Sequence, residues 1–343
     1  MLKTIEFKGA IIVKSYTMIS GLILAMMFFN ACSTNDSESV SSPTTPGNLK
    51  FEERWASSEN LQITINQQNA QILSVTSGHK DYKPSWSKTG DKLTFFRFVS
   101  KGRGFHTWRT KICVVNIDGT GVRELTIGHY PDFNPTWTRD DRNLIIFNRH
   151  STERGWENQI FMIPSDATVG DEQLVSHPSN AYYEWAFSAL KDGRIFIDRK
   201  GSDFAKSFLL TPNPGKLGKY EEIKRPTEKL WHKLSVSPSE TKIAYMLDND
   251  RKLYTYRDVV IAIADFDIAH LKVENQLIIT EMNKDYTYEY PRWTKDESCV
   301  IYDSNKSGKY QIYAYHLENK TTTRISPDIN RDYRFGNFEN LPK

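Results

Sequence analysis

The segment Trp86–Phe95 (WSKTGDKLTF) contains the pattern that decides the fold. An aromatic or apolar residue is usually followed by Ser or Thr, then by an aliphatic residue about seven positions later and an aromatic residue two or three positions after that. The pattern returns at Trp137, Phe187, Val236 and Trp293, at intervals of 51, 50, 49 and 57 residues. A period near 50 residues, built from short β-rich segments, is typical of a β-propeller in which each repeat forms one blade.

Each copy is expected to contribute four strands. In the first copy these are Lys83–Ser87, Lys92–Phe98, Thr110–Asn116 and Arg123–Thr126, and Asp118–Gly121 (DGTG) supplies the turn before the last strand. The third strand contains an unbroken apolar run, as expected for a blade that its neighbours cover on both faces. Few windows sustain the 3.6-residue period of an amphipathic helix, which argues against a solenoid of stacked helices.

The two ends of the folded region are expected to share one blade. Leu61–Asn66 and Ala70–Val75 indicate a strand pair before the first copy, and Arg334–Phe338 indicates an innermost strand after the last one. Joining them makes six blades and leaves no free sheet edge between first and last. Seven blades are the alternative if Phe51–Trp55 and the insertion Asp265–Gln276 contribute further strands. We therefore predict an all-β, six-bladed propeller.

Three segments carry a resemblance to a known family. Pro84–Ser87 (PSWS), Asn134–Thr138 (NPTWT) and Tyr290–Asp296 (YPRWTKD), each followed by an apolar strand, resemble the WD-like propeller repeat of the TolB family, as does Ile312-Tyr313. The resemblance covers residues 80–327 and implies the propeller fold, but not a function, because such repeats serve many roles. TolB proteins carry a further N-terminal domain, where we expect only a tether. Prolyl oligopeptidase-type peptidases also carry propellers, but no Gly-x-Ser-x-Gly elbow occurs here.

The N-terminal region is expected to direct export and lipidation. Met18–Phe29 is an apolar run of 12 residues after a weakly basic start, which suits a signal peptide better than a membrane span. Phe29–Cys32 (FNAC) resembles a bacterial lipobox, so residues 1–31 are expected to be cleaved and Cys32 to carry lipid. Residues 32–49 then form a Ser/Thr/Pro-rich flexible tether, and residues 50–343 form the propeller. The alternative is an ordinary cleaved signal or a short anchor.

Composition limits the remaining function classes. The chain has 343 residues, and 45 Lys and Arg balance 42 Asp and Glu. This composition excludes a multi-span membrane protein and a wholly disordered chain. A net charge of +3 gives no reason to expect a nucleic-acid partner. Cys113 and Cys299 fall in strands of non-neighbouring copies, so we expect two free, unreactive thiols rather than a disulfide.

The candidate site residues lie on two sets of loops that share one face of a propeller. The first set, here called the leading loops, runs into the innermost strands, and the second set joins second to third strands. Candidates on or beside the leading loops are His79, Tyr82, His129, His177, Tyr182 and His232. Candidates on the second set are Arg97, His106, Trp108, Arg149, His150, Trp156 and Arg199. The fold is expected to gather these side chains at one mouth of a central channel.

Two kinds of chemistry suit these residues. Arginines pair with carboxylates of an anionic glycan, while His and Tyr bind ligands or move protons near neutral pH. The catalytic candidates of an enzyme would be His129, His177, Arg149 and Tyr182. That enzyme would be a polysaccharide lyase acting on uronate glycans by β-elimination, a class that this chain resembles only in architecture. No cofactor is expected, a divalent metal is the alternative, and no His or Cys spacing indicates a metal site.

Each candidate also has a structural interpretation. The arginines belong to the repeat pattern, the histidines can satisfy hydrogen bonds between blades, and Trp86, Trp137 and Trp293 are expected in the core. We favour a non-catalytic propeller, anchored to the outer membrane through Cys32 and facing the periplasm or the cell surface. It would bind an envelope protein or an anionic glycan through its loop-rich face. The lyase is the alternative, and an envelope scaffold analogous to TolB is a third interpretation.

Overall fold

The computed structural model describes residues 55–59, 62–67, 70–74, 76, 78–102, 107–151, 157–176, 183–200, 205–213, 216–227, 229–248, 259–283 and 285–338. All of them belong to the second of two compact units, residues 46–343. The signal peptide, lipidated Cys32 and tether predicted from the sequence lie outside the described residues. No helix within the described part is long and apolar enough to cross a bilayer.

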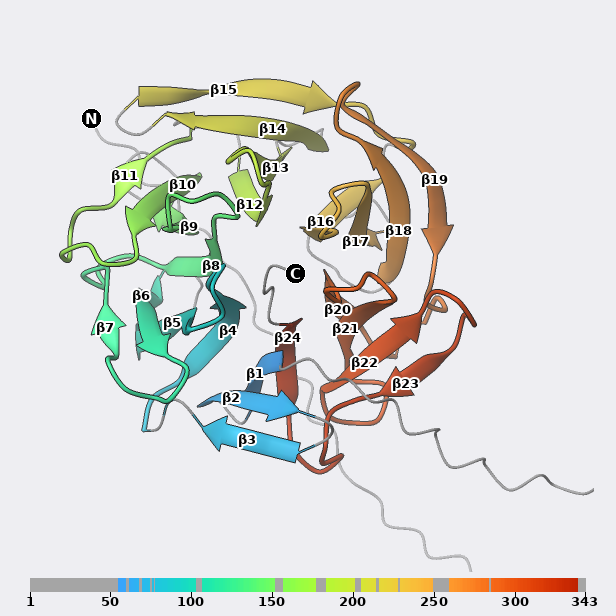
Figure 1. The fold of residues 1–343 in the computed structure, drawn as a ribbon, viewed down its shortest axis with the longest axis horizontal. Coiled ribbons are helices and arrows are strands. Elements are labelled where there is room, and N and C mark those ends of the chain that lie inside the picture. The colour runs from blue at the N-terminus through green and yellow to red at the C-terminus, as the bar shows by residue number, and fades with distance from the viewer. Residues whose placement is uncertain are drawn as a thin grey trace, which may run out of the picture. The chain divides into compact units, whose positions relative to one another are not determined.

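The described strands form six four-stranded antiparallel sheets arranged as blades around a ring (Figure 1). Blade 1 consists of β4 (Asp81–Trp86), β5 (Lys92–Ser100), β6 (Arg109–Asn116) and β7 (Arg123–Glu124). Blade 2 consists of β8 (Asp132–Trp137), β9 (Leu144–Ser151), β10 (Glu157–Pro164) and β11 (Gln173–Leu174). Blade 3 consists of β12 (Tyr183–Ala189), β13 (Ile195–Lys200), β14 (Ala205–Asn213) and β15 (Lys216–Ile223).

The remaining three blades follow the same order from the centre outward. Blade 4 consists of β16 (Leu230–Val236), β17 (Lys242–Asp248), β18 (Val259–Asp267) and β19 (Lys272–Ile278). Blade 5 consists of β20 (Tyr288–Trp293), β21 (Cys299–Ser304), β22 (Gln311–His316) and β23 (Thr322–Arg324). Blade 6 consists of β24 (Tyr333–Phe338), β1 (Trp55–Glu59), β2 (Gln62–Gln67) and β3 (Ala70–Ser74).

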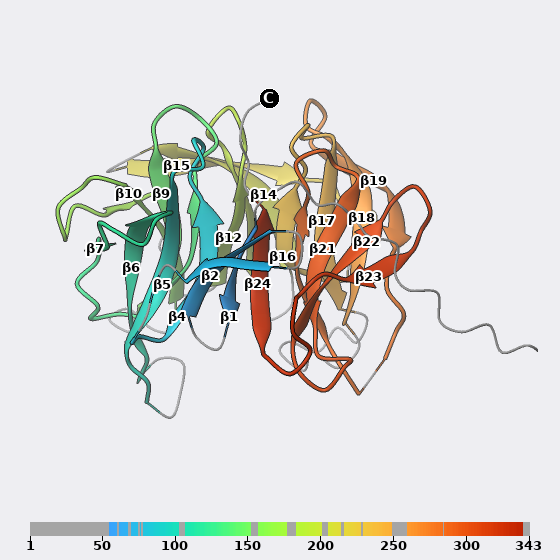
Figure 2. The same cartoon turned by 60° about the horizontal axis from the view of Figure 1, so that its bottom comes forward.

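Blade 6 joins the two ends of the propeller. Its innermost strand, β24, pairs antiparallel with β1, and Glu59 lies opposite Tyr333 in the register (Figures 1 and 2). The prediction of six blades with a composite last blade is confirmed. The seven-blade alternative is wrong: β1 begins at Trp55 and is the second strand of blade 6, while Asp265–Gln276 belongs to β18 and β19 of blade 4 and the turn between them.

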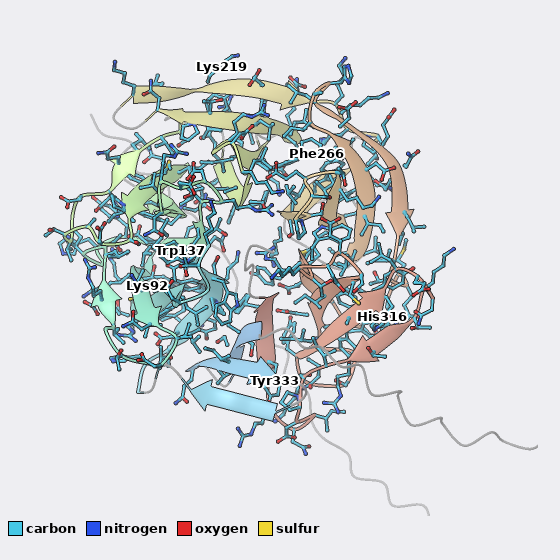
Figure 3. All side chains as sticks on the ribbon, viewed as in Figure 1. Lys92, Trp137, Lys219, Phe266, His316 and Tyr333 are labelled. Atoms are coloured by element: carbon cyan, nitrogen blue, oxygen red, sulfur yellow. The ribbon has the colours of Figure 1, made fainter. Side chains whose placement is uncertain are left out.

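The core lies between adjacent blades. Every residue of the second strand β21 is buried, because blades 4 and 6 cover its two faces, whereas the outermost strand β19 is largely exposed. One apolar cluster combines Ala56 and Ile63 of blade 6 with Trp86 and Phe95 of blade 1. Figure 3 places Trp137 toward the inner part of its blade and Lys219 at the outer rim. Burial across blade boundaries therefore holds consecutive repeats together.

The repeat tryptophans are confirmed as core residues that also connect blades. Trp86, Trp137 and Trp293 are each no more than 4% exposed. The indole Nε1 of Trp137 donates to the carbonyl of Ser85 in the preceding blade (2.9 Å), and Trp293 donates to Ser235 in the same way (3.2 Å). A buried carbonyl without such a donor would cost roughly 1–3 kcal/mol, so these bonds fix how the inner strands approach each other.

The third repeat has a different register from the one expected. Ala189 pairs with Ile195 as Trp86 pairs with Leu93, so Ala189, not Phe187, occupies the tryptophan position of blade 3. The turn that follows is also shorter, since Leu190 N bonds to Arg194 O across four positions. The assignment of Phe187 to the tryptophan position was wrong because this blade lacks the tryptophan and the pattern selected a nearby aromatic residue.

A bulge recurs in the innermost strands. The register shifts between Tyr82 and Ser85 in blade 1, and comparable shifts occur in blades 2, 3, 4 and 5 and between β24 and β1 of blade 6. The residues at or near these bulges that have positive φ, between 50° and 60°, are Lys83, Asn134, Lys233, Tyr290 and Phe335. A non-glycine residue in this conformation costs about 1–2 kcal/mol, so the surrounding packing must stabilise each one. We refer to these five residues as the bulge ring.

The two remaining cysteines are free and buried, as expected. Burial raises the pKa of the Cys113 thiol to about 12. The thiolate, which is the reactive form, is therefore scarce at neutral pH.

We predict that ring closure depends on β24. Deletion of residues 333–343 leaves β1 with an unpaired edge and opens the interface between blades 5 and 6. The shortened chain should aggregate or lose its cooperative urea transition, and a synthetic peptide spanning residues 329–343 should restore solubility when added during refolding. A scrambled peptide of the same composition is the control. An unchanged urea midpoint for the shortened chain would contradict the closure.

Candidate functional site

The three candidate arginines are each held by an acid from the same blade. Arg97 donates to both carboxylate oxygens of Asp81 (2.8 and 2.9 Å), Arg149 to both of Asp132 (2.7 and 2.9 Å), and Arg199 to Glu184 Oε1 (2.9 and 2.5 Å). In each pair the two residues face each other across the first and second strands. The same contact is thus repeated in three consecutive blades.

Burial sets the electrostatics of these pairs. Arg97 and Arg149 are only 7% exposed, and Arg149 also contacts Glu172 at 2.8 Å. Burial raises the pKa of Asp132 and of Glu184, and the hydrogen bonds from their arginines oppose that shift. Removing one partner from such a pair leaves a buried charge unbalanced, at a cost of about 3–5 kcal/mol. Each arginine is therefore held by an acid of its own blade, as expected if these arginines have a structural role in the repeat.

The described candidate histidines lie in different surroundings. His79 and His129 are exposed on their leading loops, whereas His150 and His232 are buried. His150 Nδ1 contacts Asn158 Oδ1 at 2.8 Å, and its ring stacks on Tyr183 of blade 3. Among the described residues, no group of three or more His, Cys, Asp or Glu is placed to hold a metal. His106, Trp156, His177 and Tyr182 lie outside the described residues.

Two aromatic candidates meet on blade 1. Tyr82 and Trp108 both pack edge-on against Phe98, with ring centroids 5.3 and 5.1 Å from that of Phe98. Tyr82 also contacts Phe335 of the bulge ring, and Lys101 lies over the Trp108 indole at 5.1 Å. Tyr82 and Trp108 therefore both contact the ring of Phe98, and both serve as packing partners within this blade or toward β24.

A buried basic cluster connects blades 3 and 4. Lys200 Nζ lies 2.5 Å from His232 Nδ1, and both side chains are almost fully buried. Burial lowers the pKa of Lys200 to about 8, while the charges of Asp198 and Asp248 oppose this shift. Burial also holds the pKa of His232 well below its usual value, with the charge of Lys200 adding to the effect. At neutral pH the Lys200 ammonium therefore donates to a neutral imidazole.

We predict that this cluster makes stability depend on pH. The folded pKa of Lys200, about 8, lies below its unfolded value of 10.5, so the unfolded chain binds more protons between these values. The free energy of unfolding should then rise with pH above 8, by at most about 1.4 kcal/mol per pH unit from this group. Lys200→Met should remove that part of the slope, whereas Lys206→Met, at an exposed position of blade 3, should retain it.

Urea denaturation measured from pH 7.5 to 9.5 tests this prediction, because tyrosine ionisation in the unfolded chain begins to dominate above about pH 10. Equal slopes in Lys200→Met and the unaltered protein would contradict the low pKa of Lys200.

The bulge ring meets in the central space enclosed by the blades. Lys83 of blade 1 donates to Asn134 Oδ1 of blade 2 (2.6 Å) and lies 4.8 Å from the ring centre of Tyr290 in blade 5. Blade 6 lies between blades 5 and 1 in the ring, so the contact between Lys83 and Tyr290 crosses the centre. Lys233 lies 3.8 Å from the same ring centre, and Phe335 packs against Tyr290 with centroids 4.6 Å apart.

A cavity of about 670 Å³, here called the vestibule, lies where the innermost strands end. Its lining comes from blades 1 to 5, namely from residues within 85–88, 136–141, 187–191, 235–239 and 292–297. These segments contain the turns between first and second strands. The leading loops lie at the opposite ends of the innermost strands, so the vestibule opens on the face opposite to the one that carries the sequence candidates.

Ion pairs and hydrogen bonds between turns hold the vestibule in shape. Arg139 of blade 2 donates to the carbonyls of Ser237 (3.1 Å) and Pro238 (3.3 Å) in blade 4, across the mouth and past blade 3. Glu240 accepts from Lys191 N at 2.6 Å and lies 3.7 Å from Arg139. Glu240 thus connects the turns of blades 2, 3 and 4.

Sequence reasoning missed the vestibule, although one signal in the repeat marks it. The position before the tryptophan is Ser85 in blade 1, Thr136 in blade 2 and Ser235 in blade 4, but it is Arg292 in blade 5. A large cation replaces a small hydroxyl residue at one point of the ring. The histidines are more conspicuous in the sequence, and they drew the prediction to the other face.

Comparison with known proteins supports the fold. TolB from Acinetobacter baumannii superposes with a TM-score of 0.64 over 84% of this chain and 67% of its own, at 14% identity. Hydrazine synthase from Kuenenia stuttgartiensis gives 0.60 over 84% of this chain at 14% identity, and this chain spans about half of its length, 47%. Oligogalacturonate lyase from Vibrio parahaemolyticus gives 0.52 over 76% and 74% of the two chains, at 11% identity.

No family model matches the chain, and no curated protein matches it in sequence. At such low identities the structural similarities show a shared propeller fold of the TolB type, which hosts unrelated functions.

Proposed function

We propose that the chain is a non-catalytic binding propeller of the cell envelope that holds a protein or an anionic glycan at the vestibule. The observation that carries this proposal is the vestibule itself, a cavity of about 670 Å³ formed by turns of five blades. Its size lies within the range of ligand pockets, and its cations come from several blades. The proposed binding face is therefore the face that carries the vestibule, opposite to the leading loops.

The charges around the mouth favour an anionic ligand. Lys88, Arg139, Lys191, Arg292 and Lys295 line the vestibule together with the acids Asp140, Asp141, Asp296 and Glu297. The carboxylates are engaged by the protein: Lys88 contacts Asp141 at 2.5 Å, and Asp296 accepts from Thr294 and Ser298. Lys191 keeps an exposed position at the rim. Lys88 and Arg139 are engaged as well, by Asp141 and by the carbonyls of Ser237 and Pro238. Lys191 and Arg292 are therefore the cations proposed to meet a charged ligand, which they would also steer toward the mouth.

We predict that the rim contributes to binding. Lys191→Glu should weaken capture of envelope components by roughly fivefold, because it reverses a charge beside the ligand. Lys206→Glu, in the same blade but on the third strand, is the matched control and should bind like the unaltered protein. The probes are an array of anionic polysaccharides and a detergent extract of cell envelopes, with bound material quantified by interferometry. Equal binding by both variants, or binding abolished only by changes on the leading loops, would contradict the location.

A polysaccharide lyase is the alternative that the sequence analysis left open, and it makes a distinct prediction on the same protein. Incubation with uronate polysaccharides would then produce unsaturated ends that absorb ultraviolet light, and Arg149→Lys or His129→Ala would reduce their rate of formation. We expect no such absorbance with or without added divalent metal. Its appearance, dependent on these residues, would replace the binding proposal.

We further propose that lipid on Cys32 attaches the protein to the outer membrane, on the basis of the segment FNAC at residues 29–32 and the tether after it. We predict that an alkyne analogue of palmitate labels the full chain in a Gram-negative host and that Cys32→Ser abolishes the label. Cys113→Ser is the control and should keep it, because Cys113 is buried in blade 1. Labelling of Cys32→Ser at the level of the unaltered protein would overturn the proposed anchor.

A further inference from the structure

The vestibule has a chemically distinct inner end. The residue before the tryptophan position is Ser85, Thr136, Ser188 and Ser235 in blades 1 to 4, and Arg292 in blade 5. All five line the vestibule. Because they occupy equivalent positions of a closed ring, the fold places four hydroxyl groups and one guanidinium around the same axis. We call this arrangement the hydroxyl–arginine ring.

Arg292 is short of partners. Within the described part of the chain its only side-chain hydrogen bond is from Nη1 to the carbonyl of the neighbouring Pro291 (2.9 Å). The charge of Asp303 acts on its guanidinium, but no described carboxylate forms an ion pair with it within 4.0 Å. A guanidinium has five N–H donors and remains protonated in proteins. This contrasts with Arg97 and Arg149, which each donate to both oxygens of an acid in their own blade.

A second cation, Lys83, interacts electrostatically with Arg292. Lys83 of the bulge ring is 7% exposed, and its ammonium donates to the amide oxygen of Asn134. Burial, followed by the charges of Arg292 and Lys233, holds the pKa of Lys83 well below its usual value, and the charges of Asp303 and Glu289 oppose that shift. The positive charges of Lys83 and Arg292 oppose each other, and buried Asp303 offsets part of the charge of both. An anion bound at Arg292 from the vestibule would reduce the remaining repulsion.

We propose that the hydroxyl–arginine ring binds the carboxylate group of a small organic acid. The planar guanidinium of Arg292 pairs with the two carboxylate oxygens, and hydroxyls of the ring donate to the remaining acceptor sites of the same group. The inference deepens the proposed function, on which it rests for the vestibule as the binding face. It adds that the inner end of the vestibule recognises a carboxylate group, whichever larger molecule carries that group.

The charge at the site suits a monoanion. Arg292 supplies one permanent positive charge, whereas the charge of Lys83 is disfavoured by burial and already offset in part by Asp303 and Glu289. A carboxylate matches one charge and the flat, two-point geometry of the guanidinium, whereas a phosphate dianion brings a second negative charge into a largely buried region. Carboxylates should therefore bind more tightly than phosphate at equal ionic strength.

The test uses the variant Arg292→Ser, which gives blade 5 the type of residue that blades 1 to 4 already have and so preserves the repeat. Thermal-shift titrations with acetate, glucuronate and triglycine measure apparent affinity, since a ligand that binds only the folded state raises the Tm. The methyl ester of glucuronate, triglycinamide, phosphate and chloride are the matched comparisons. Arg331→Ser changes an exposed arginine near the start of β24 and is the control variant.

The proposal expects at least one of the three acids to bind, its neutral counterpart or chloride to bind far more weakly, and Arg292→Ser to reduce the affinity roughly tenfold or more, as for a lost charged hydrogen bond. Arg331→Ser should remain within about twofold. The relative affinities of glucuronate and triglycine would identify whether a sugar acid or a peptide terminus is the better source of the carboxylate.

Acid binding that is unchanged in Arg292→Ser, or a Tm rise that chloride reproduces, would overturn the proposal, as would the absence of a Tm rise with all three acids. These outcomes are separate from the fate of the proposed function. Envelope polymers that still bind through Lys191 would leave the vestibule as a binding face without an acid site. If small acids bind through Arg292 but no envelope polymer is captured, the acid site stands and the proposed binding function is wrong.

Discussion

The backbone hydrogen bonds between β24 and β1 are the interaction on which the rest of the propeller depends. They join segments almost 280 positions apart and convert a row of blades into a ring. Their blade also covers two neighbours: Tyr333 packs with Ile301 and Ile312 of blade 5, while Ala56 and Ile63 pack with Trp86 of blade 1. Without the pair, β1 would present an unpaired edge and two blade interfaces would lose apolar contacts.

Closure also explains why strained residues persist at the centre. Each positive-φ position of the bulge ring opposes folding by about 1–2 kcal/mol, yet the bulges recur where the inner strands converge. Their side chains then meet across the centre, where Tyr290 contacts Lys83, Lys233 and Phe335 from three other blades. The same constraint brings the turns of five blades around the vestibule. The strained residues, their packing at the centre and the vestibule are therefore all consequences of ring closure.

The sequence predicted the architecture well because a repeat supplies many copies of one pattern. The period near 50 residues and the strand at Arg334–Phe338 were enough to anticipate the composite blade. The register of blade 3 could not be read, since Ala189 stands where other blades have tryptophan and the following turn is shorter. The pairing of Arg97 with Asp81 could not be predicted either, because the sequence does not show which residues face each other across two strands.

The location of the vestibule was missed for a different reason. Histidines attract attention as single residues, whereas Arg292 is informative only when the five repeats are aligned and its position is compared with Ser85, Thr136, Ser188 and Ser235. That comparison requires the corrected register of blade 3 and the knowledge that these side chains line one cavity. Native-state hydrogen exchange of the β24 amides tests the central claim, ring closure, most directly. The account predicts exchange as slow as that of β20 in blade 5, through global unfolding alone, whereas rapid exchange of β24 by local opening would contradict it.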